Sequence, residues 1–234
     1  MRMAWHDLLF MHYEIDAQAL QPILPDSVKL DTFDGKAYVG IVPFRMSDVA
    51  PRYCPELPLV SRFPELNVRT YVTIDNKPGV WFFSLDATSR LAVRAARTMF
   101  HLNYVDASIT FKKDRRPCPG KWINYHSVRT DASAPPAELH CEYRPMGDWY
   151  FARPATLAHW LTARYCLYTQ NRKGQLYRGE INHSPWRLQD AQAIVHANTM
   201  TEGLGLDISG QQPLLHFASE TKVVAWLLEK VSVG

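Results

Sequence analysis

Short β-type runs, separated by turn-forming residues, follow one another along most of this chain, and they limit its possible folds more than any other feature. Two turn signals are specific: Asp34-Gly35, a preferred two-residue hairpin turn, and the turn former at residues 76–79. Roughly a dozen such runs, mostly in hairpin order, exclude a doubly wound parallel sheet, which alternates strands with helices. The pattern predicts an α+β fold that is mainly β: a large, mostly antiparallel sheet curled into a barrel-like body around an internal pocket.

Only one stretch has the pattern of a longer helix. Residues 89–100 begin with the capping residue Ser89 and carry an apolar stripe at helical spacing. Shorter helices are predicted after Asp16, over residues 156–161, and within residues 198–206, where glycine ends the helix.

Two further segments are assigned from their breakers and patterns. Residues 47–64 contain four prolines and are predicted to form an irregular loop. Because this loop directly precedes a polar strand that begins at Glu65, we expect it to cover the mouth of the pocket. Near the end of the chain, residues 213–219 and 222–228 are predicted as a terminal strand pair.

The composition is that of a single folded domain over residues 1–234. The chain is 47% hydrophobic, which is enough for a core, and no repeat or linker interrupts it. A net charge of +3 gives no positive excess for a phosphate backbone. Residues 1–16 lack the apolar core of a signal peptide, and no stretch approaches the roughly 20 apolar residues of a membrane span. We therefore expect a soluble, cytoplasmic protein with no nucleic-acid and no membrane partner.

The cysteines and histidines give no metal or disulfide signal. There is no Cys-x-x-Cys, no His-x-x-x-His and no Glu-x-x-His on a helix, and the glycine-rich nucleotide-binding and serine-hydrolase motifs are absent too. We expect reduced thiols, no metal and no cofactor. The four cysteines are Cys54, Cys118, Cys141 and Cys166.

The strand over residues 65–74 has one apolar and one polar face. Alternation places Glu65, Asn67 and Arg69 on the polar face. Such a set could hold a small polar or anionic ligand, with Arg69 binding a carboxylate through two hydrogen bonds. The alternative is an ordinary solvent face with a cross-strand salt bridge. If the face lies inside the protein, we expect Glu65 to pair with Arg69 while no ligand is bound.

Four runs together resemble the DUF2071 family, also called YqjF-like. They are LDTFDGKAYVGIVPFRM, FPELNVRTYV, AARTMFHLNYVDASI and RGEINHSPWRL. This family is similar in fold to acetoacetate decarboxylase, whose superfamily is a sheet folded over on itself around an internal pocket. The resemblance implies the same fold here.

Acetoacetate decarboxylase forms a Schiff base through a lysine, which its family presents after the helix in a Pro-Lys-Lys context. The equivalent stretch of this chain, residues 102–107, contains no lysine. The adjacent pair Lys112-Lys113 lies in a charged run typical of a solvated turn. Schiff-base chemistry is therefore not expected, and the family positions that do match are Glu65 and Arg97.

Two more groups of residues are candidates. Tyr104 and Asp106 lie where the resemblance places the superfamily's nucleophile, so they could serve as general acid or base; alternatively they are a packed tyrosine and a carboxylate at a strand start. Glu180, His183 and Trp186 could form one wall of a pocket. Glu180 and His183 have opposite strand parity, so they need not act together.

We expect a small-molecule enzyme with acid/base chemistry on a carbonyl or carboxylate compound. Its candidate catalytic residues are Glu65, Tyr104 and Asp106, and its candidate ligand-binding residues are Asn67, Arg69, Arg97, Glu180, His183 and Trp186. The alternative is a non-catalytic binding or sensor protein that uses the same cavity, and a third reading is an interaction protein with exposed aromatic residues. A strongly raised pKa at a buried carboxyl would favour the enzyme. The expected partner is a small polar or anionic ligand, and assembly into a homo-oligomer is left open.

Overall fold

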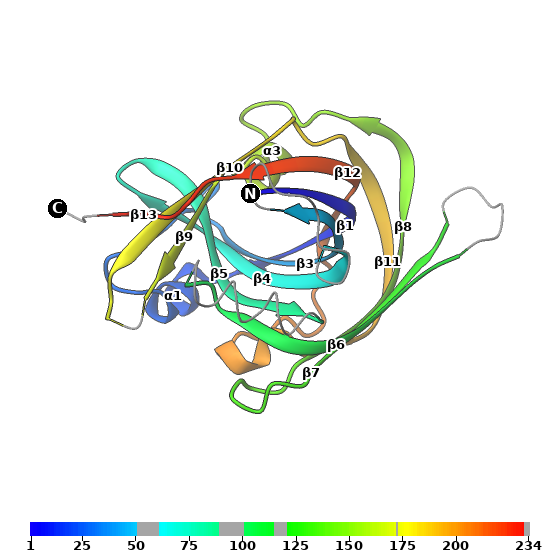
Figure 1. The fold of residues 1–234 in the computed structure, drawn as a ribbon, viewed down its shortest axis with the longest axis horizontal. Helices are drawn as coiled ribbons and strands as arrows, with labels where there is room; N and C mark the ends of the chain where they lie inside the picture. The colour runs from blue at the N-terminus through cyan, green and yellow to red at the C-terminus, as the bar shows by residue number, and fades with distance from the viewer. Residues whose placement is uncertain (51–60, 89–100, 115–120, 172, 232–234) are drawn as a thin grey trace.

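The computed structural model describes residues 1–50, 61–88, 101–114, 121–171 and 173–231. Within these ranges thirteen strands form one sheet, accompanied by short helices (Figure 1). The strands are β1 (Arg2–Ile15), β2 (Lys29–Leu30), β3 (Ala37–Ala50), β4 (Phe63–Ile74), β5 (Lys77–Ala87), β6 (Tyr104–Lys113), β7 (Ile123–Arg129), β8 (Glu138–Tyr150), β9 (Cys166–Gln170), β10 (Leu176–His183), β11 (Leu188–Asn198), β12 (Leu214–Ala225) and β13 (Glu229–Lys230). The helices are α1 (Ala17–Leu20), η1 (Gln21–Ile23), α3 (Leu157–Thr162) and η2 (Glu202–Leu204). The expected fold class, mainly β with few helices, is confirmed.

The sheet closes on itself around a central group of strands in the order β12-β1-β3-β4-β5. The edge of β5 that faces away from β4 is shared by two strands, because Val80 and Trp81 pair with β9 while residues 85–87 pair with β6. The edge of β12 is shared in the same way between β11 and β10. The pairings of β5 with β9 and with β6 are parallel, whereas its pairing with β4 is antiparallel, so the sheet is mixed. In Figure 1 the central strands run through the middle of the molecule, with β9 and β10 on one side and β8 and β11 on the other.

This arrangement buries both faces of the central strands. On β4, the apolar face with Leu66, Val68 and Val72 packs into the largest hydrophobic cluster of the molecule. The opposite face, with Glu65, Asn67, Arg69 and Tyr71, lies beside two smaller clusters built around Phe10 and Leu161. The polar face of β4, as we call these four residues, is therefore inside the protein and not an ordinary solvent face.

Two tight turns explain where strands begin. Asp34 and Gly35 both have positive φ, and so do Asp75 and Asn76, as a two-residue hairpin turn requires. The second turn therefore precedes the position expected for it, since β5 already begins at Lys77.

The structure corrects two sequence-based assignments and leaves others outside the described residues. The segment 47–64 is strand at both ends, and only its part 51–60 lies outside the described residues, so its proposed role as a cover is not described. The predicted helix 89–100 also lies outside them. The terminal strand pair is wrong: β12 is one continuous strand, because it pairs with β1 along its length and no turn former interrupts it. The strand β1 itself was not expected from the sequence.

The two cysteines that the structure describes, Cys141 and Cys166, are free and buried. Cys54 and Cys118 lie outside the described ranges. In the described part of the chain, no helix has the length and apolar character to cross a membrane.

Candidate functional site

Cross-strand pairing brings four of the expected site residues onto one surface. Glu65 in β4 pairs with Ala87 in β5, which pairs with Asp106 in β6. In the neighbouring row, Asn67 is joined to Tyr104 in the same way through a leucine of β5. Residues paired directly project to the same side of a sheet, so the polar face of β4 continues onto β6.

Glu65 is a buried acid that has no cationic partner among the described residues. Its side chain is 2% exposed, and the Tyr104 hydroxyl donates a hydrogen bond to its Oε2 at 3.1 Å. Burial raises the pKa of Glu65 from 4.5 to about 8; the Tyr104 hydrogen bond lowers it and the charge of Asp86 raises it. The carboxyl group is therefore mostly neutral at pH 7, which meets the criterion that favours an enzyme.

The expected ion pair between Glu65 and Arg69 does not form. Four residues along a strand span about 13 Å, which is too far for direct contact without bending the side chains toward each other. None of the ion pairs among the described residues includes either side chain. The Arg69 guanidinium instead lies 5.5 Å from the centre of the Phe10 ring and 5.8 Å from that of Tyr71, and its Nε is buried without a hydrogen-bond partner. Arg69 remains half-buried, so its charge is available to an anion.

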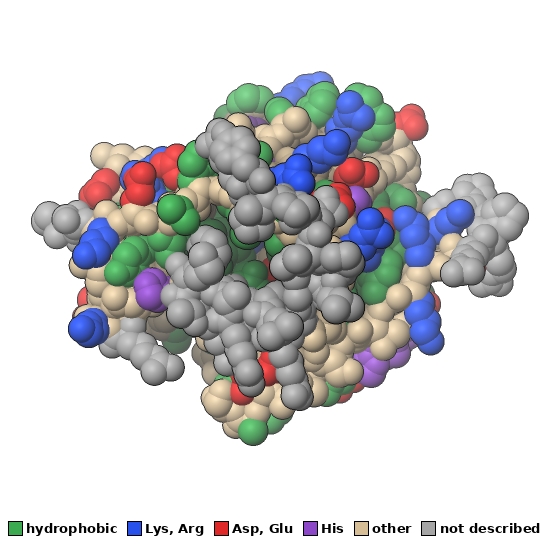
Figure 2. Space-filling view, viewed as in Figure 1, with side chains coloured by type: hydrophobic (Ala, Val, Ile, Leu, Met, Phe, Trp, Pro, Cys, Tyr) green, Lys and Arg blue, Asp and Glu red, His purple; other side chains and the backbone are tan. Residues whose placement is uncertain are grey.

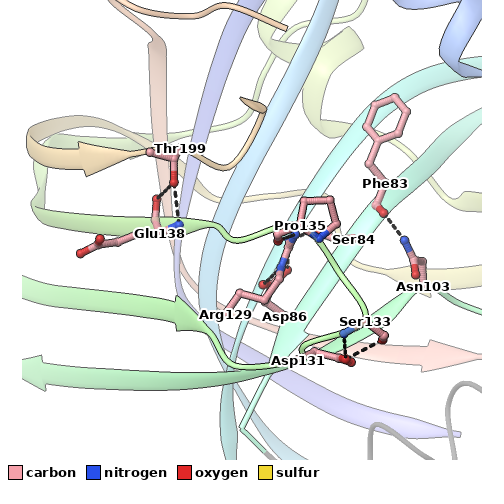
Figure 3. Close-up of polar contacts among 10 residues, drawn as sticks. All are labelled: Phe83, Ser84, Asp86, Asn103, Arg129, Asp131, Ser133, Pro135, Glu138 and Thr199. Carbon is pink, nitrogen blue, oxygen red and sulfur yellow. Dashed lines mark hydrogen bonds and ion pairs between the residues drawn. The ribbon is translucent and has the colours of Figure 1, made fainter. Parts of the chain in front are cut away.

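A second buried carboxylate, Asp86, is fully paired (Figure 3). Arg129 donates to its two oxygens through Nε at 2.9 Å and Nη2 at 3.0 Å, and Nη2 also donates to the Ser84 hydroxyl at 3.0 Å. Asp86 pairs with Leu66 in β4, so it projects to the opposite side of the sheet from Glu65. The Asp86–Arg129 pair ties β5 to the end of β7.

The imidazole of His12 was missed by the sequence analysis. His12 in β1 lies opposite Gly40 in β3, which in turn lies opposite Arg69. A Cβ atom on Gly40 would be 3.2 Å from His12 Cδ2 and 3.4 Å from Arg69 Cγ, so the absence of a side chain lets both approach. The Tyr71 hydroxyl donates to the Leu161 carbonyl at 2.8 Å and lies 2.7 Å from His12 Nε2. Burial, and then the charge of Arg69, hold the pKa of His12 well below its usual value.

Trp186 packs in the same hydrophobic cluster as Phe10, and the His183 ring lies against Trp186. His183 Nδ1 is 2.7 Å from the Ser184 carbonyl oxygen, and Trp186 Nε1 donates to the Thr162 carbonyl at 2.8 Å. The two rings are 4.5 Å apart, and Trp186 also meets the edge of the Phe10 ring at 5.2 Å. Burial lowers the pKa of His183; the Ser184 hydrogen bond raises it and the charge of Arg69 lowers it.

Two expected site residues are not brought into this group. Glu180 is half-exposed and forms ion pairs with Lys77 and Arg178, and the Lys77 hydrogen bond lowers its pKa. Arg97 lies outside the described residues.

The lysines are all exposed or half-exposed. The chain has nine lysines, the structure describes all of them, and none is buried. Lys77 is half-buried and paired with Glu180, while the other eight are exposed. On the face shown in Figure 2, lysine and arginine side chains lie on the outside of the molecule, interspersed with acidic ones.

Surface hollows elsewhere do not involve the polar face. One groove of about 630 Å³ runs beside Tyr13 and the loop 205–213, and another of about 660 Å³ lies beside α1. Within the described ranges, no group of three or more His, Cys, Asp or Glu side chains is arranged to hold a metal ion.

Comparison with known proteins identifies relatives over nearly the whole chain. The model of the DUF2071 family, described as an uncharacterized conserved protein, matches residues 2–222. The uncharacterized protein YqjF of Bacillus subtilis (strain 168) is 42% identical over 232 residues, which cover 99% of this chain and 93% of that protein.

Solved structures share the fold at low sequence identity. The enduracididine biosynthesis enzyme MppR, complexed with pyruvate, has a TM-score of 0.69 at 9% identity, covering 99% of this chain and 90% of that one. An acetoacetate decarboxylase-like enzyme from Sphingomonas wittichii RW1 has a TM-score of 0.67 at 11% identity, covering 100% and 94%. The acetoacetate decarboxylase of Legionella pneumophila has a TM-score of 0.62 at 13% identity, covering 99% and 87%. This likeness concerns the fold.

Proposed function

The chain belongs to the DUF2071 family and has an acetoacetate decarboxylase-like fold, and from its buried acid we propose that it is a small-molecule enzyme performing acid/base chemistry on a carbonyl or carboxylate compound. The observation that carries this proposal is Glu65, a carboxyl group with a pKa of about 8 on an interior polar surface. A structural carboxylate of this fold can be fully compensated, as Asp86 is by Arg129. None of the described residues compensates Glu65 in this way, which is typical of a group that exchanges protons.

In the proposed reaction Glu65 is the general acid. Its neutral carboxyl group gives its proton to the oxygen of the substrate carbonyl. Asp106, whose Oδ1 has no hydrogen-bond partner, accepts a proton from the carbon next to that carbonyl. The carbon–hydrogen bond electrons then form the carbon–carbon double bond of an enol, and proton return to either face of the carbon completes an exchange. Tyr104 positions the Glu65 carboxyl through its hydrogen bond.

Arg69 holds the substrate in this scheme. A guanidinium with an unpaired Nε can bind a carboxylate through two parallel hydrogen bonds. The aromatic surroundings, Phe10 and Tyr71, exclude water and strengthen that interaction. Asn67 lies between Arg69 and Glu65 on the same strand face and offers a further polar contact to the ligand.

The proposed chemistry does not pass through a lysine Schiff base. A Schiff-base lysine must be a neutral amine at working pH, which requires a dry pocket or a nearby cation. The nine lysines of this chain are exposed or half-exposed. Treatment with acetoacetate and borohydride is therefore expected to leave every lysine unmodified in peptide mass spectrometry, and a reduced adduct on any of them would contradict this part of the mechanism.

The test is hydrogen–deuterium exchange at carbon. The protein is incubated in D2O with acetoacetate or 2-oxobutanoate, and loss of the C–H signal next to the carbonyl is followed by proton NMR. We expect exchange above the buffer rate, a loss of about 100-fold or more in Glu65→Gln, and no change in Glu180→Gln, which removes a carboxylate outside the site. Exchange that survives Glu65→Gln, or that never exceeds the buffer rate, would overturn the proposal and favour the non-catalytic binding alternative.

A further inference from the structure

The polar face gathers buried polar atoms that no protein group satisfies. Ten buried side-chain atoms of the described residues have no hydrogen-bond partner. Five of them lie on or beside this face: His12 Nδ1, Asn67 Oδ1, Arg69 Nε, Asp106 Oδ1 and His183 Nε2. Native proteins leave few such atoms unsatisfied, so this concentration points to a polar ligand.

The hydrogen bond that His183 makes shows which of its two ring nitrogens carries no proton. Its Nδ1 lies 2.7 Å from the Ser184 carbonyl oxygen, and a carbonyl oxygen only accepts. Nδ1 therefore carries the proton. Because burial lowers the pKa of His183, the ring is neutral and its Nε2 holds a lone pair. Nε2 is consequently a buried acceptor to which no described group donates.

The same reasoning applies to His12. The Tyr71 hydroxyl has one proton, and it lies within hydrogen-bond distance of the Leu161 carbonyl and of His12 Nε2. The carbonyl cannot donate, so Tyr71 gives its proton to Leu161 and accepts one from His12 Nε2. The neutral His12 ring then presents the lone pair of its Nδ1, which is also buried and without a partner.

The free groups of Arg69, His12 and His183 thus have complementary roles. Arg69 offers a donor and a positive charge, while His12 and His183 offer acceptors. A second cation between them is disfavoured, because the charge of Arg69 already disfavours protonation of both imidazoles. A hydroxyl group donates its one proton to such an acceptor without adding charge, whereas an ammonium group adds a charge.

We propose that this face recognises a small hydroxycarboxylate, with Arg69 binding the carboxylate and the free Nε2 of His183 accepting the proton of the hydroxyl group. This inference rests on the proposed function, since it names the substrate class of the same site. A site built to accept a hydroxyl proton rejects analogues that lack it, because its buried acceptors are then left unpaired.

The experiment compares four ligands of one carbon skeleton: 2-hydroxybutanoate, 2-oxobutanoate, 2-aminobutanoate and butanoate. Isothermal titration calorimetry at pH 7 is expected to give 2-hydroxybutanoate an affinity at least tenfold higher than the other three. His183→Phe should reduce that preference to about threefold or less while butanoate binding is retained, which shows that the variant still folds and binds. His196→Phe, which removes an exposed imidazole, is the matched control and should behave as the parent.

Nitrogen-15 NMR of the imidazoles gives an independent readout. Free His183 should appear as the neutral tautomer with the proton on Nδ1, and its Nε2 signal should shift on adding 2-hydroxybutanoate but not butanoate. Equal affinities for the four ligands, no binding of 2-hydroxybutanoate, or a proton on Nε2 in the free protein would each overturn the inference. Failure of the proposed function is distinguishable, because it would abolish the carbon exchange and its dependence on Glu65 while leaving the hydroxyl preference intact.

Discussion

Two buried acids lie almost side by side in this protein, yet their surroundings differ completely. Asp86 and Glu65 occupy neighbouring cross-strand rows of β4 and β5, but they project to opposite sides of the sheet. Asp86 meets a guanidinium in a fork of hydrogen bonds, whereas Glu65 meets a single phenol. The first arrangement keeps a charge inside a protein, and the second keeps a carboxyl group neutral. The paired strands β4 and β5 therefore carry a charge-paired acid on one side of the sheet and a neutral acid on the other.

The largest effect is expected when the ion pair between Asp86 and Arg129 is broken. Arg129→Met leaves the Asp86 carboxylate buried and unpaired, so we expect a loss of about 3 to 5 kcal/mol in the free energy of unfolding. The double variant Asp86→Leu with Arg129→Met removes both charges and should lose less than the single variant. Urea unfolding at pH 7 measures both. A single variant within about 1 kcal/mol of the parent would show that the pair is not needed to compensate Asp86.

The next test concerns the sign of the pH dependence at Glu65. Its pKa rises from 4.5 to about 8 on folding, so the folded protein holds this proton more tightly than the unfolded chain. Its contribution to stability is fully present below pH 4.5 and is lost progressively as the pH rises toward 8, at about 1.4 kcal/mol per pH unit. A paired Asp with a lowered pKa would have the opposite sign.

Glu65→Gln removes this titration while keeping a neutral polar side chain. Relative to Glu65→Gln, the parent is expected to lose about 2 kcal/mol of unfolding free energy between pH 6 and pH 8. Urea unfolding of both proteins across this range isolates the effect, because all other titrating groups are shared. Parallel stability curves would mean that Glu65 is ionised in the folded protein, and its role as the general acid would fail.

Sequence patterns predicted the polar face of β4, which carries Glu65, well. Strand alternation correctly placed Glu65, Asn67 and Arg69 on one face, because a side chain's direction on a strand depends only on local geometry. The mainly β fold also followed from turn signals and run lengths. The predicted Glu65–Arg69 pair failed, since alternation says which way a side chain points but not how far it reaches.

The partners across strands could not be predicted in the same way. Tyr104 meets Glu65 only because β6 adds to the second half of β5, a parallel contact between segments far apart in the sequence. His12 was missed because β1 carries apolar residues on both faces, so its strand shows no alternation. The Asp86–Arg129 pair likewise depends on how β7 returns to the sheet.

The smallest effect is expected at the hydrogen bond that Glu65 does have. Tyr104→Phe removes the one contact that lowers the pKa of Glu65, so this pKa should rise above about 8 while stability falls by only about 1 kcal/mol. Carbon-13 NMR titration of the Glu65 carboxyl group measures the first quantity and urea unfolding the second. Tyr125→Phe is the matched control, because the Tyr125 hydroxyl is buried without a hydrogen-bond partner and its removal should leave the Glu65 titration nearly unchanged. A fall in the Glu65 pKa in Tyr104→Phe would instead mean that water reaches the carboxyl group once the phenol is gone. The phenol would then be excluding solvent more than it stabilises the ionised acid, and the neutral state of Glu65 would depend on packing rather than on the missing cation.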